Sequence, residues 1–183
     1  KVIIKSEFLG HEADDILVDS GSIPANKLKF MIKDRNMADM PQIMRKAVEE
    51  CIDVFNRTGD PQVIDIILDK ATYRQMSEEA ASIGNKFINN LVKVYIDLAN
   101  IKIFLRVKKM GKSWDFLQKM LLDGGSIDNK VYLQSLQEPL DNFINAIRFT
   151  PYGSFCEEGI EAYKNTGSLT KFEKLSDNYI LSF

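Results

Sequence analysis

The chain has 183 residues, of which 45% are hydrophobic and 27% charged, a composition typical of a globular protein of one or two small domains. Lysine and arginine (24) nearly balance aspartate and glutamate (26), so total charge predicts no general affinity for nucleic acid or anionic membranes. Charged residues interrupt every apolar run before the roughly 18 residues that a membrane-spanning helix requires, and no signal peptide is evident. We therefore expect a cytoplasmic chain whose two distant cysteines, Cys51 and Cys156, are buried or half-buried thiols.

Apolar residues recur at helical spacing along most of the chain, whereas no stretch alternates convincingly with the period of two that a β-strand requires. Capping residues mark the helix ends: Ser22 and Ser113 are each expected to begin a helix, and Gly59 and Gly167 to close two others. The expected helices cover residues 1–9, 24–33, 42–57, 61–83, 85–111, 114–122, 128–149 with a bend near Pro139, 151–165 and 168–183. The sequence therefore predicts an all-α fold.

Residues 85–111 form the longest of these patterns, without proline or interior glycine. At about 1.5 Å per residue, this helix would be close to 40 Å long. Its apolar positions form two adjacent stripes, which predicts a broad buried face. One stripe contains Phe87, Leu91, Val94, Leu98, Ile101 and Leu105, and the other contains Ile88, Val92, Tyr95 and Ala99.

An internal repeat relates the two halves of the chain, and its offset grows slightly along the sequence, as small insertions in connecting segments would produce. Three matches carry it: residues 1–5 and Gly10 with 102–106 and Gly111, offset 101; residues 17–23 with 121–127, offset 104; and residues 49–55 and Gly59 with 157–163 and Gly167, offset 108. Three matches in the same order are unlikely to arise by chance.

The repeat predicts tandem, pseudo-symmetric helical bundles joined by copies of the long helix. We expect a first repeat unit at residues 1–101 that lacks its beginning, because Lys1 corresponds to Lys102 in the middle of the 85–111 helix. A second unit at 102–183 would lack its end. The repeat thus predicts that the chain is part of a longer protein.

His11 is the single histidine, and it lies beside several acidic residues in the stretch GHEADD. A metal site built from His11, Glu12, Asp14 and Asp15 is one interpretation. However, no HExxH motif and no second histidine complete a zinc or di-iron ligand set. The alternative, which we favour, is a solvated loop whose acidic residues stabilise a nearby helix start.

Two other groups of charged residues have a structural explanation. The glutamate pairs at 49–50 and 157–158 are repeat-equivalent and are expected to be exposed helix charges rather than catalytic acids and bases. A basic cluster, Lys102, Arg106, Lys108, Lys109 and Lys112, lies near a helix C-terminus, where the helix dipole favours cations. Docking of an acidic partner on this cluster is the lesser alternative.

Aromatic residues are expected to pack between helices: Phe104 in the core stripe, and Phe143, Phe149, Tyr152, Phe155 and Tyr163 nearby. The chain has no phosphate-binding glycine loop, no dinucleotide fingerprint and no nucleophile elbow. The sequence therefore predicts no catalytic residue, no cofactor-binding site and no metal site, and favours a helical-repeat protein that binds other proteins.

Several short motifs occur in order: LDK-x-x-Y at residues 68–73, GN at 84–85, ID-x-x-NIK at 96–102, DGGSI at 123–127 and TPY at 150–152. Together with the repeat, they resemble the C subunit of bacterial and archaeal V-type (A-type) rotary ATPases, which is equivalent to the d subunit of the eukaryotic V-ATPase. The resemblance covers essentially the whole chain. It implies three similar helical bundles arranged as a funnel, of which this chain would hold a part.

The resemblance also implies a function. The chain would be a non-enzymatic rotor component on the cytoplasmic side of the membrane, between the D and F subunits of the central stalk and the proteolipid ring. It would pass torque between them during ion transport or ATP synthesis, without binding nucleotide or a small-molecule substrate. A generic helical adaptor of another assembly is the alternative that the repeat alone would permit.

Overall fold

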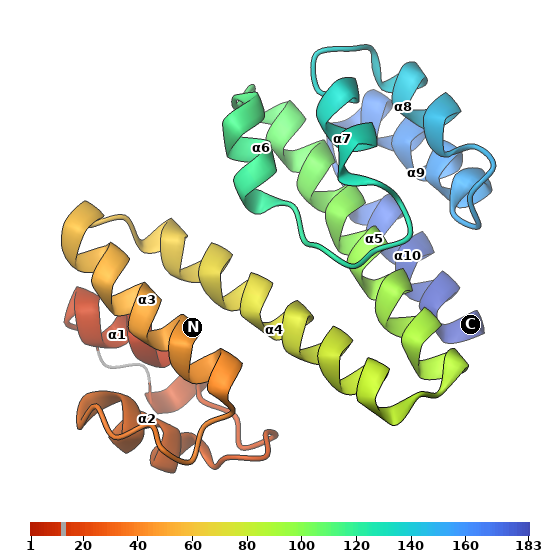
Figure 1. The fold of residues 1–183 in the computed structure, drawn as a ribbon. Coiled ribbons are helices and arrows are strands. Elements are labelled where there is room, and N and C mark those ends of the chain that lie inside the picture. The colour runs from red at the N-terminus through yellow and green to blue at the C-terminus, as the bar shows by residue number, and fades with distance from the viewer. Residues whose placement is uncertain (12–13) are drawn as a thin grey trace. The chain divides into compact units, whose positions relative to one another are not determined.

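The computed structural model describes residues 1–11 and 14–183, which form ten α-helices, a short 3-10 helix and no β-strand. The predicted all-α fold is confirmed. The chain divides into two compact units, residues 1–75 and 76–183, and Figure 1 shows the helices of each. These two units are compact bodies in space and differ from the repeat units that the sequence predicts, 1–101 and 102–183. The boundary between the repeat units stays a prediction.

The first unit packs its helices around one apolar core. Its elements are α1 (Val2–Leu9), η1 (Asp14–Ile16), α2 (Ala25–Lys33), α3 (Gln42–Thr58) and the larger part of α4 (Pro61–Ile83). The buried core residues are Ile4, Met31, Ile32, Met37, Met40, Ala47, Val48, Cys51, Ile64, Leu68 and Ala71. Cys51 is inaccessible to solvent, as expected.

The second unit is built around α5 (Lys86–Lys109), which contacts α6 (Trp114–Met120) and α10 (Thr170–Ser182). The other helices are α7 (Asn129–Ser135), α8 (Leu140–Ile147) and α9 (Gly153–Thr166). Figure 1 shows them gathered around α5. The rings of Phe104, Tyr132 and Phe143, all fully buried, lie together at the centre of the core. The long helix is therefore the central element of this unit, and Cys156 is buried in the same core, as expected.

Most predicted helix ends are confirmed. Gly59 and Gly167 have left-handed φ values of 64° and 67° and end α3 and α9, in a conformation that glycine adopts at low cost. The Asn85 side chain accepts hydrogen bonds from the backbone N–H groups of Phe87 and Ile88 and so caps α5. The Ser113 hydroxyl similarly caps α6.

Ser22 does not cap α2, so that prediction is wrong. The carboxylate of Asp19 instead accepts the backbone N–H of Ala25 at 2.5 Å. A carboxylate is the stronger acceptor at a helix N-terminus, because the helix dipole favours negative charge there.

The expected helix at 128–149 is two helices, α7 and α8. Pro139 precedes α8, cannot donate a backbone hydrogen bond, and disfavours a helical conformation at the residue before it. Carbonyl groups left free at the break accept hydrogen bonds from the ammonium group of Lys108, which reaches those of Leu136 and Glu138 at 2.6 Å. The break is therefore stabilised from α5.

Repeat-equivalent residues make equivalent contacts within each unit. Lys5 on α1 pairs with Asp65 on α4 at 2.5 Å, and Arg106 on α5 pairs with Glu173 on α10 at 2.8 Å. Lys5 and Arg106 are equivalent at offset 101, and Asp65 and Glu173 at offset 108. Such exposed pairs contribute only about 0.2–1 kcal/mol each. These pairs matter because they show which helices are equivalent in the two units: α1 is equivalent to the C-terminal half of α5, and α4 to α10.

Candidate functional site

Asp97 is the most unusual residue of the second unit, because its carboxylate is fully buried on the core side of α5. Its oxygens accept the backbone N–H groups of Ser126 at 3.0 Å and Ile127 at 3.1 Å. They also accept the Tyr152 hydroxyl at 2.8 Å and the Ser126 hydroxyl. The carboxylate thereby joins α5 to the DGGSI turn (residues 123–127) and to the residue that precedes α9.

These donors compensate the cost of removing a charge from water. An unpaired buried carboxylate would be unstable as the ion, whereas hydrogen bonds from backbone N–H and hydroxyl groups favour the charged form. Burial, followed by the negative charge of Asp97, raises the pKa of Tyr152 above its usual range. The tyrosine therefore stays protonated and remains a donor to the carboxylate.

Gly125 makes the close approach of the DGGSI turn possible. A Cβ atom at this position would lie 2.2 Å from the Oδ1 atom of Asp97 and 3.2 Å from the Ile96 side chain. No other residue type leaves room for the carboxylate, so the position of Asp97 requires a glycine at residue 125.

Asn100 makes a second connection one turn further along α5, and it is also fully buried. Its amide oxygen accepts the backbone N–H of Leu122 at 2.8 Å, and its amide nitrogen donates to the Leu122 carbonyl at 2.9 Å. Both backbone groups of Leu122 are therefore used by a side chain. This explains why α6 ends at Met120 rather than at residue 122 as expected.

Three of the motifs noted in the sequence thus meet at one place: ID-x-x-NIK supplies Asp97 and Asn100, DGGSI supplies the turn, and TPY supplies Tyr152. Sequence reasoning gave Asp97 and Asn100 no role, and it assigned Tyr152 only to packing between helices. The available signal was an aspartate and an asparagine within the apolar face of a long helix, where buried polar groups need partners. We call the buried residues Asp97, Asn100 and Tyr152 the buried polar cluster; Ser126, which binds Asp97, is exposed at its edge.

The basic cluster at the end of α5 is largely engaged within the second unit. Lys108 donates to carbonyl groups after α7, and burial lowers its pKa. Lys109 donates to the carbonyl of Gly167 at 2.7 Å, at the C-terminus of α9. Lys112 lies 5.8 Å from the ring centre of Phe116. Lys108 and Lys109 thus lie at the C-terminal ends of α7 and α9, where the helix dipole is negative, as well as at the C-terminal end of α5.

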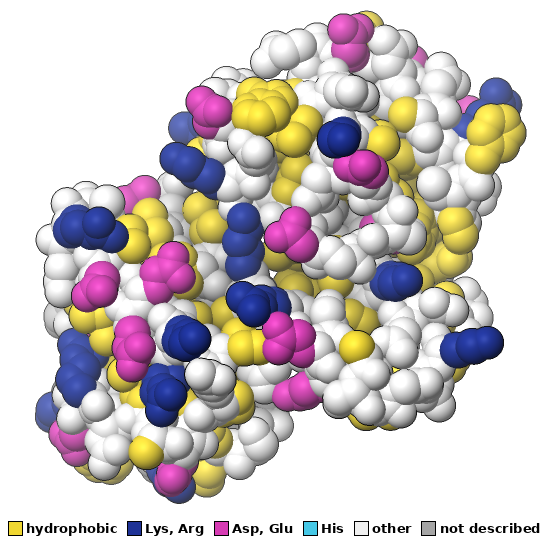
Figure 2. Space-filling view, viewed as in Figure 1, with side chains coloured by type: hydrophobic (Ala, Val, Ile, Leu, Met, Phe, Trp, Pro, Cys, Tyr) yellow, Lys and Arg dark blue, Asp and Glu magenta, His cyan; other side chains and the backbone are white. Residues whose placement is uncertain are grey.

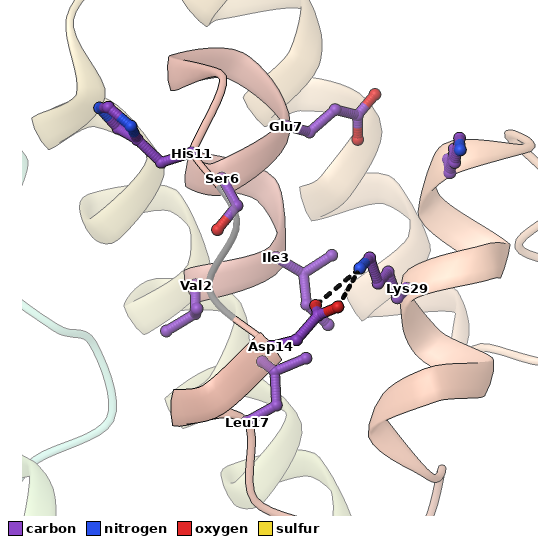
Figure 3. A pocket seen from close by; sticks show the side chains of 9 residues that line it. Val2, Ile3, Ser6, Glu7, His11, Asp14, Leu17 and Lys29 are labelled. Carbon is purple, nitrogen blue, oxygen red and sulfur yellow. Dashed lines mark hydrogen bonds and ion pairs between the residues drawn. The ribbon is translucent and has the colours of Figure 1, made fainter.

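The residues considered for a metal site do not come together among those described. Asp14 pairs with Lys29 at 2.6 Å, and Figure 3 shows His11 pointing away from this pair across a pocket of about 260 Å³. Glu12 lies outside the described residues. No group of three potential metal-binding side chains occurs in residues 1–11 and 14–183.

The remaining predicted groups lie largely as expected. The glutamate pairs at 49–50 and 157–158 are exposed, and Glu158 pairs with Lys171 at 2.9 Å. Phe143, Tyr152 and Tyr163 are buried, and Phe155 is partly buried. Phe149 is 96% exposed, so its predicted packing is wrong; it lies between α8 and α9, where the chain turns at the surface. On the face drawn in Figure 2, acidic and basic side chains are interspersed.

The fold and the buried polar cluster define an all-helical protein whose buried polar side chains bind other parts of the same unit. The family described as "ATP synthase (C/AC39) subunit" matches residues 1–183, so the chain belongs to this family. It is therefore related to a component of the V/A-type ATPases. Within the described parts of the chain, no helix is long and apolar enough to cross a membrane.

Curated relatives agree with this family. The chain is 24% identical to the C subunit of the A-type ATP synthase of Methanosphaera stadtmanae, over 96% of the chain and 50% of the relative. It is 23% identical to that of Methanocaldococcus jannaschii (99% and 48%) and 25% identical to that of Pyrococcus horikoshii (98% and 50%). The chain thus spans about half the length of the curated relatives it matches. No solved structure gave a match.

Replacing the buried carboxylate should destabilise the protein. We expect Asp97→Asn to lower the free energy of unfolding by about 2–4 kcal/mol, because the amide presents donors to groups that are themselves donors. For a chain of this size, that corresponds to a melting temperature lower by about 5–15 °C. Thermal unfolding followed by circular dichroism measures it. Asp177→Asn, at an exposed position on α10, is the matched control and should change little. Equal effects of the two substitutions would contradict the assigned role.

Adding one methyl group at Gly125 tests the close approach directly. Gly125→Ala should cost about 1–3 kcal/mol in unfolding free energy, because the new Cβ would overlap the Asp97 carboxylate. Gly21→Ala is the control at the repeat-equivalent position, where the nearest atom to a Cβ is 3.7 Å away and φ is not left-handed. It should be neutral or slightly stabilising. Urea unfolding of both variants measures the difference, and a neutral Gly125→Ala would refute the steric argument.

Proposed function

We propose that the chain is part of a non-catalytic rotor component that couples the central stalk of a V/A-type ATPase to the membrane proteolipid ring. Its family membership, together with curated relatives that are the C subunits of A-type ATP synthases, supports this proposal. The proposed partners are the D and F subunits of the central stalk on one side and the proteolipid ring on the other. The proposed location is the cytoplasmic side of the membrane, without a membrane span of its own.

The packing within the second unit suits a part that transmits force. Helices packed at the density of a protein interior resist deformation. Here α5 is additionally connected by side-chain hydrogen bonds to the DGGSI turn, to Leu122 and to Tyr152, and by Lys108 and Lys109 to the ends of α7 and α9. Contacts of this kind fix the directions of several helices against one long helix, so a load applied to one helix is shared by the others.

The chemistry of the buried polar cluster favours a structural role over a catalytic one. The Asp97 oxygens already accept backbone and hydroxyl hydrogen bonds and are closed off from solvent. A general base must instead reach a proton of a bound substrate. Tyr152, whose pKa is raised, is likewise held as a donor to the carboxylate. We propose that ATP is bound and hydrolysed by other members of the complex.

Binding to purified partners tests the proposal. The full-length protein should be retained both by a complex of the D and F stalk subunits and by a detergent-solubilised proteolipid ring, and should hydrolyse no ATP alone. Asp177→Asn serves as a folded control variant with unchanged binding. If the protein fails to bind the stalk complex or fails to bind the ring, the proposal of a rotor component is wrong. Retention by an unrelated assembly alone would favour the alternative of a generic helical adaptor.

A further inference from the structure

The first unit contains a second copy of the turn that receives Asp97. The DSGSI turn (residues 19–23) matches the DGGSI turn at offset 104. In each turn the leading aspartate accepts a hydrogen bond from the residue six positions later, although the donors differ. Asp19 accepts the backbone N–H of Ala25 at 2.5 Å, and Asp123 accepts the side-chain amide of Asn129 at 3.2 Å. A helix begins at that later residue in both copies, α2 and α7.

The chain enters these two helices with nearly the same backbone conformation. Pro24 has φ −55° and ψ 140°, and its equivalent Asp128 has φ −61° and ψ 132°. The turns differ at their second residue, where Gly124 has a φ of 98° and the first copy has Ser20. The portion that binds the carboxylate in the second copy, Gly-Ser-Ile, is identical in sequence in both.

The two turns differ in what they hold. In the second unit, the N–H groups of Ser126 and Ile127 donate to Asp97. In the first unit, no described residue accepts a hydrogen bond from the N–H of Ser22 or Ile23, and Gly21 is exposed whereas Gly125 is half-buried. The two serines, Ser22 and Ser126, are both exposed, so they differ in having an acceptor for the N–H. A Cβ on Gly21 would meet only atoms of Ile23, at 3.7 Å or more, whereas a Cβ on Gly125 would overlap Asp97.

The apolar residue beside each turn shows the same difference. Leu122 is 3% exposed, and Asn100 on α5 holds its backbone. Its equivalent at offset 104, Val18, is 76% exposed. Val18 thus lies uncovered beside N–H groups that have no acceptor among the described residues, whereas α5 covers the equivalent residue and binds the equivalent N–H groups in the second unit.

The repeat specifies which helix face fits. The equivalent ion pairs Lys5–Asp65 and Arg106–Glu173 align α1 with the C-terminal half of α5. In that alignment, Asp97 and Asn100 correspond to positions on the N-terminal side of Lys1. The surface around Val18 and the DSGSI turn therefore corresponds to the surface that α5 covers with its Asp-x-x-Asn sequence.

We propose that Val18 and the DSGSI turn form a docking site for a helix that continues α1 in the N-terminal direction and carries Asp-x-x-Asn in the register of Asp97 and Asn100. The aspartate accepts the N–H groups of Ser22 and Ile23 and the Ser22 hydroxyl, and the asparagine binds the backbone of Val18. The ligand of this site is thus a helix-borne carboxylate. The inference stands on the internal repeat and does not rest on the proposed rotor function.

A chain extended at its N-terminus tests the site. A copy of residues 85–101 is placed directly before Lys1, so that the added aspartate and asparagine stand in the register that the repeat requires. Two-dimensional 1H–15N NMR then reports the backbone N–H groups of Ser22 and Ile23. With the extension, these signals should move downfield and exchange with solvent about tenfold more slowly or more, a factor that corresponds to about 1.4 kcal/mol.

Two matched variants of the extended chain isolate the carboxylate and the space it needs. Replacing the added aspartate by asparagine should return the Ser22 and Ile23 signals toward those of the original chain. Gly21→Ala should do the same in the extended chain while leaving the melting temperature of the original chain unchanged. Unchanged Ser22 and Ile23 signals in the aspartate-bearing extension would overturn the proposal, even if the added segment is not helical, because docking is what should order it.

Discussion

A buried carboxylate needs hydrogen-bond donors, and that requirement determines much of the second unit. The cost of leaving such an ion unpaired in the interior is several kcal/mol. The DGGSI turn and Tyr152 supply the donors that the Asp97 carboxylate requires, so their positions are fixed relative to α5. Gly125 must lack a side chain for the same reason. The long helix therefore acts as the reference to which a turn nearly thirty residues later, and a helix start beyond it, are attached.

The internal repeat allows the second unit to be compared with the first. Both units use left-handed glycines to end equivalent helices, equivalent ion pairs, and an aspartate that contacts the residue six positions later. Among the described residues, one difference between the two copies is the carboxylate, which is bound to the turn of the second unit alone. In the second unit, where α5 binds the turn through Asp97 and Leu122 through Asn100, the apolar residue beside the turn is also covered.

Local features could be predicted from the sequence, whereas connections between distant residues could not. Helical periodicity, the glycine at position 59 and the cap at Ser113 depend on a few neighbouring residues, and all three predictions are confirmed. The break of 128–149 into two helices occurs at Pro139, where the sequence indicated only a bend, and the carbonyls freed there are bound by Lys108 from another helix. Phe149 was expected to pack because it is aromatic, but the chain turns outward at that point. The capping role of Ser22 was lost to Asp19, whose carboxylate reaches the same helix start.

The buried polar cluster was the largest omission, although its motifs were noted as marks of the family. Recognising it required knowing that residues 97, 126 and 152 meet, and only the repeat hinted at such long-range order. The most direct test concerns the hydrogen bond from the Tyr152 hydroxyl to the Asp97 carboxylate, which should stabilise the folded protein. A double-mutant cycle with Asp97→Asn and Tyr152→Phe, measured by urea unfolding, tests this most directly. The account predicts a coupling energy of about 1–3 kcal/mol, and additivity of the two substitutions within about 0.5 kcal/mol would contradict it.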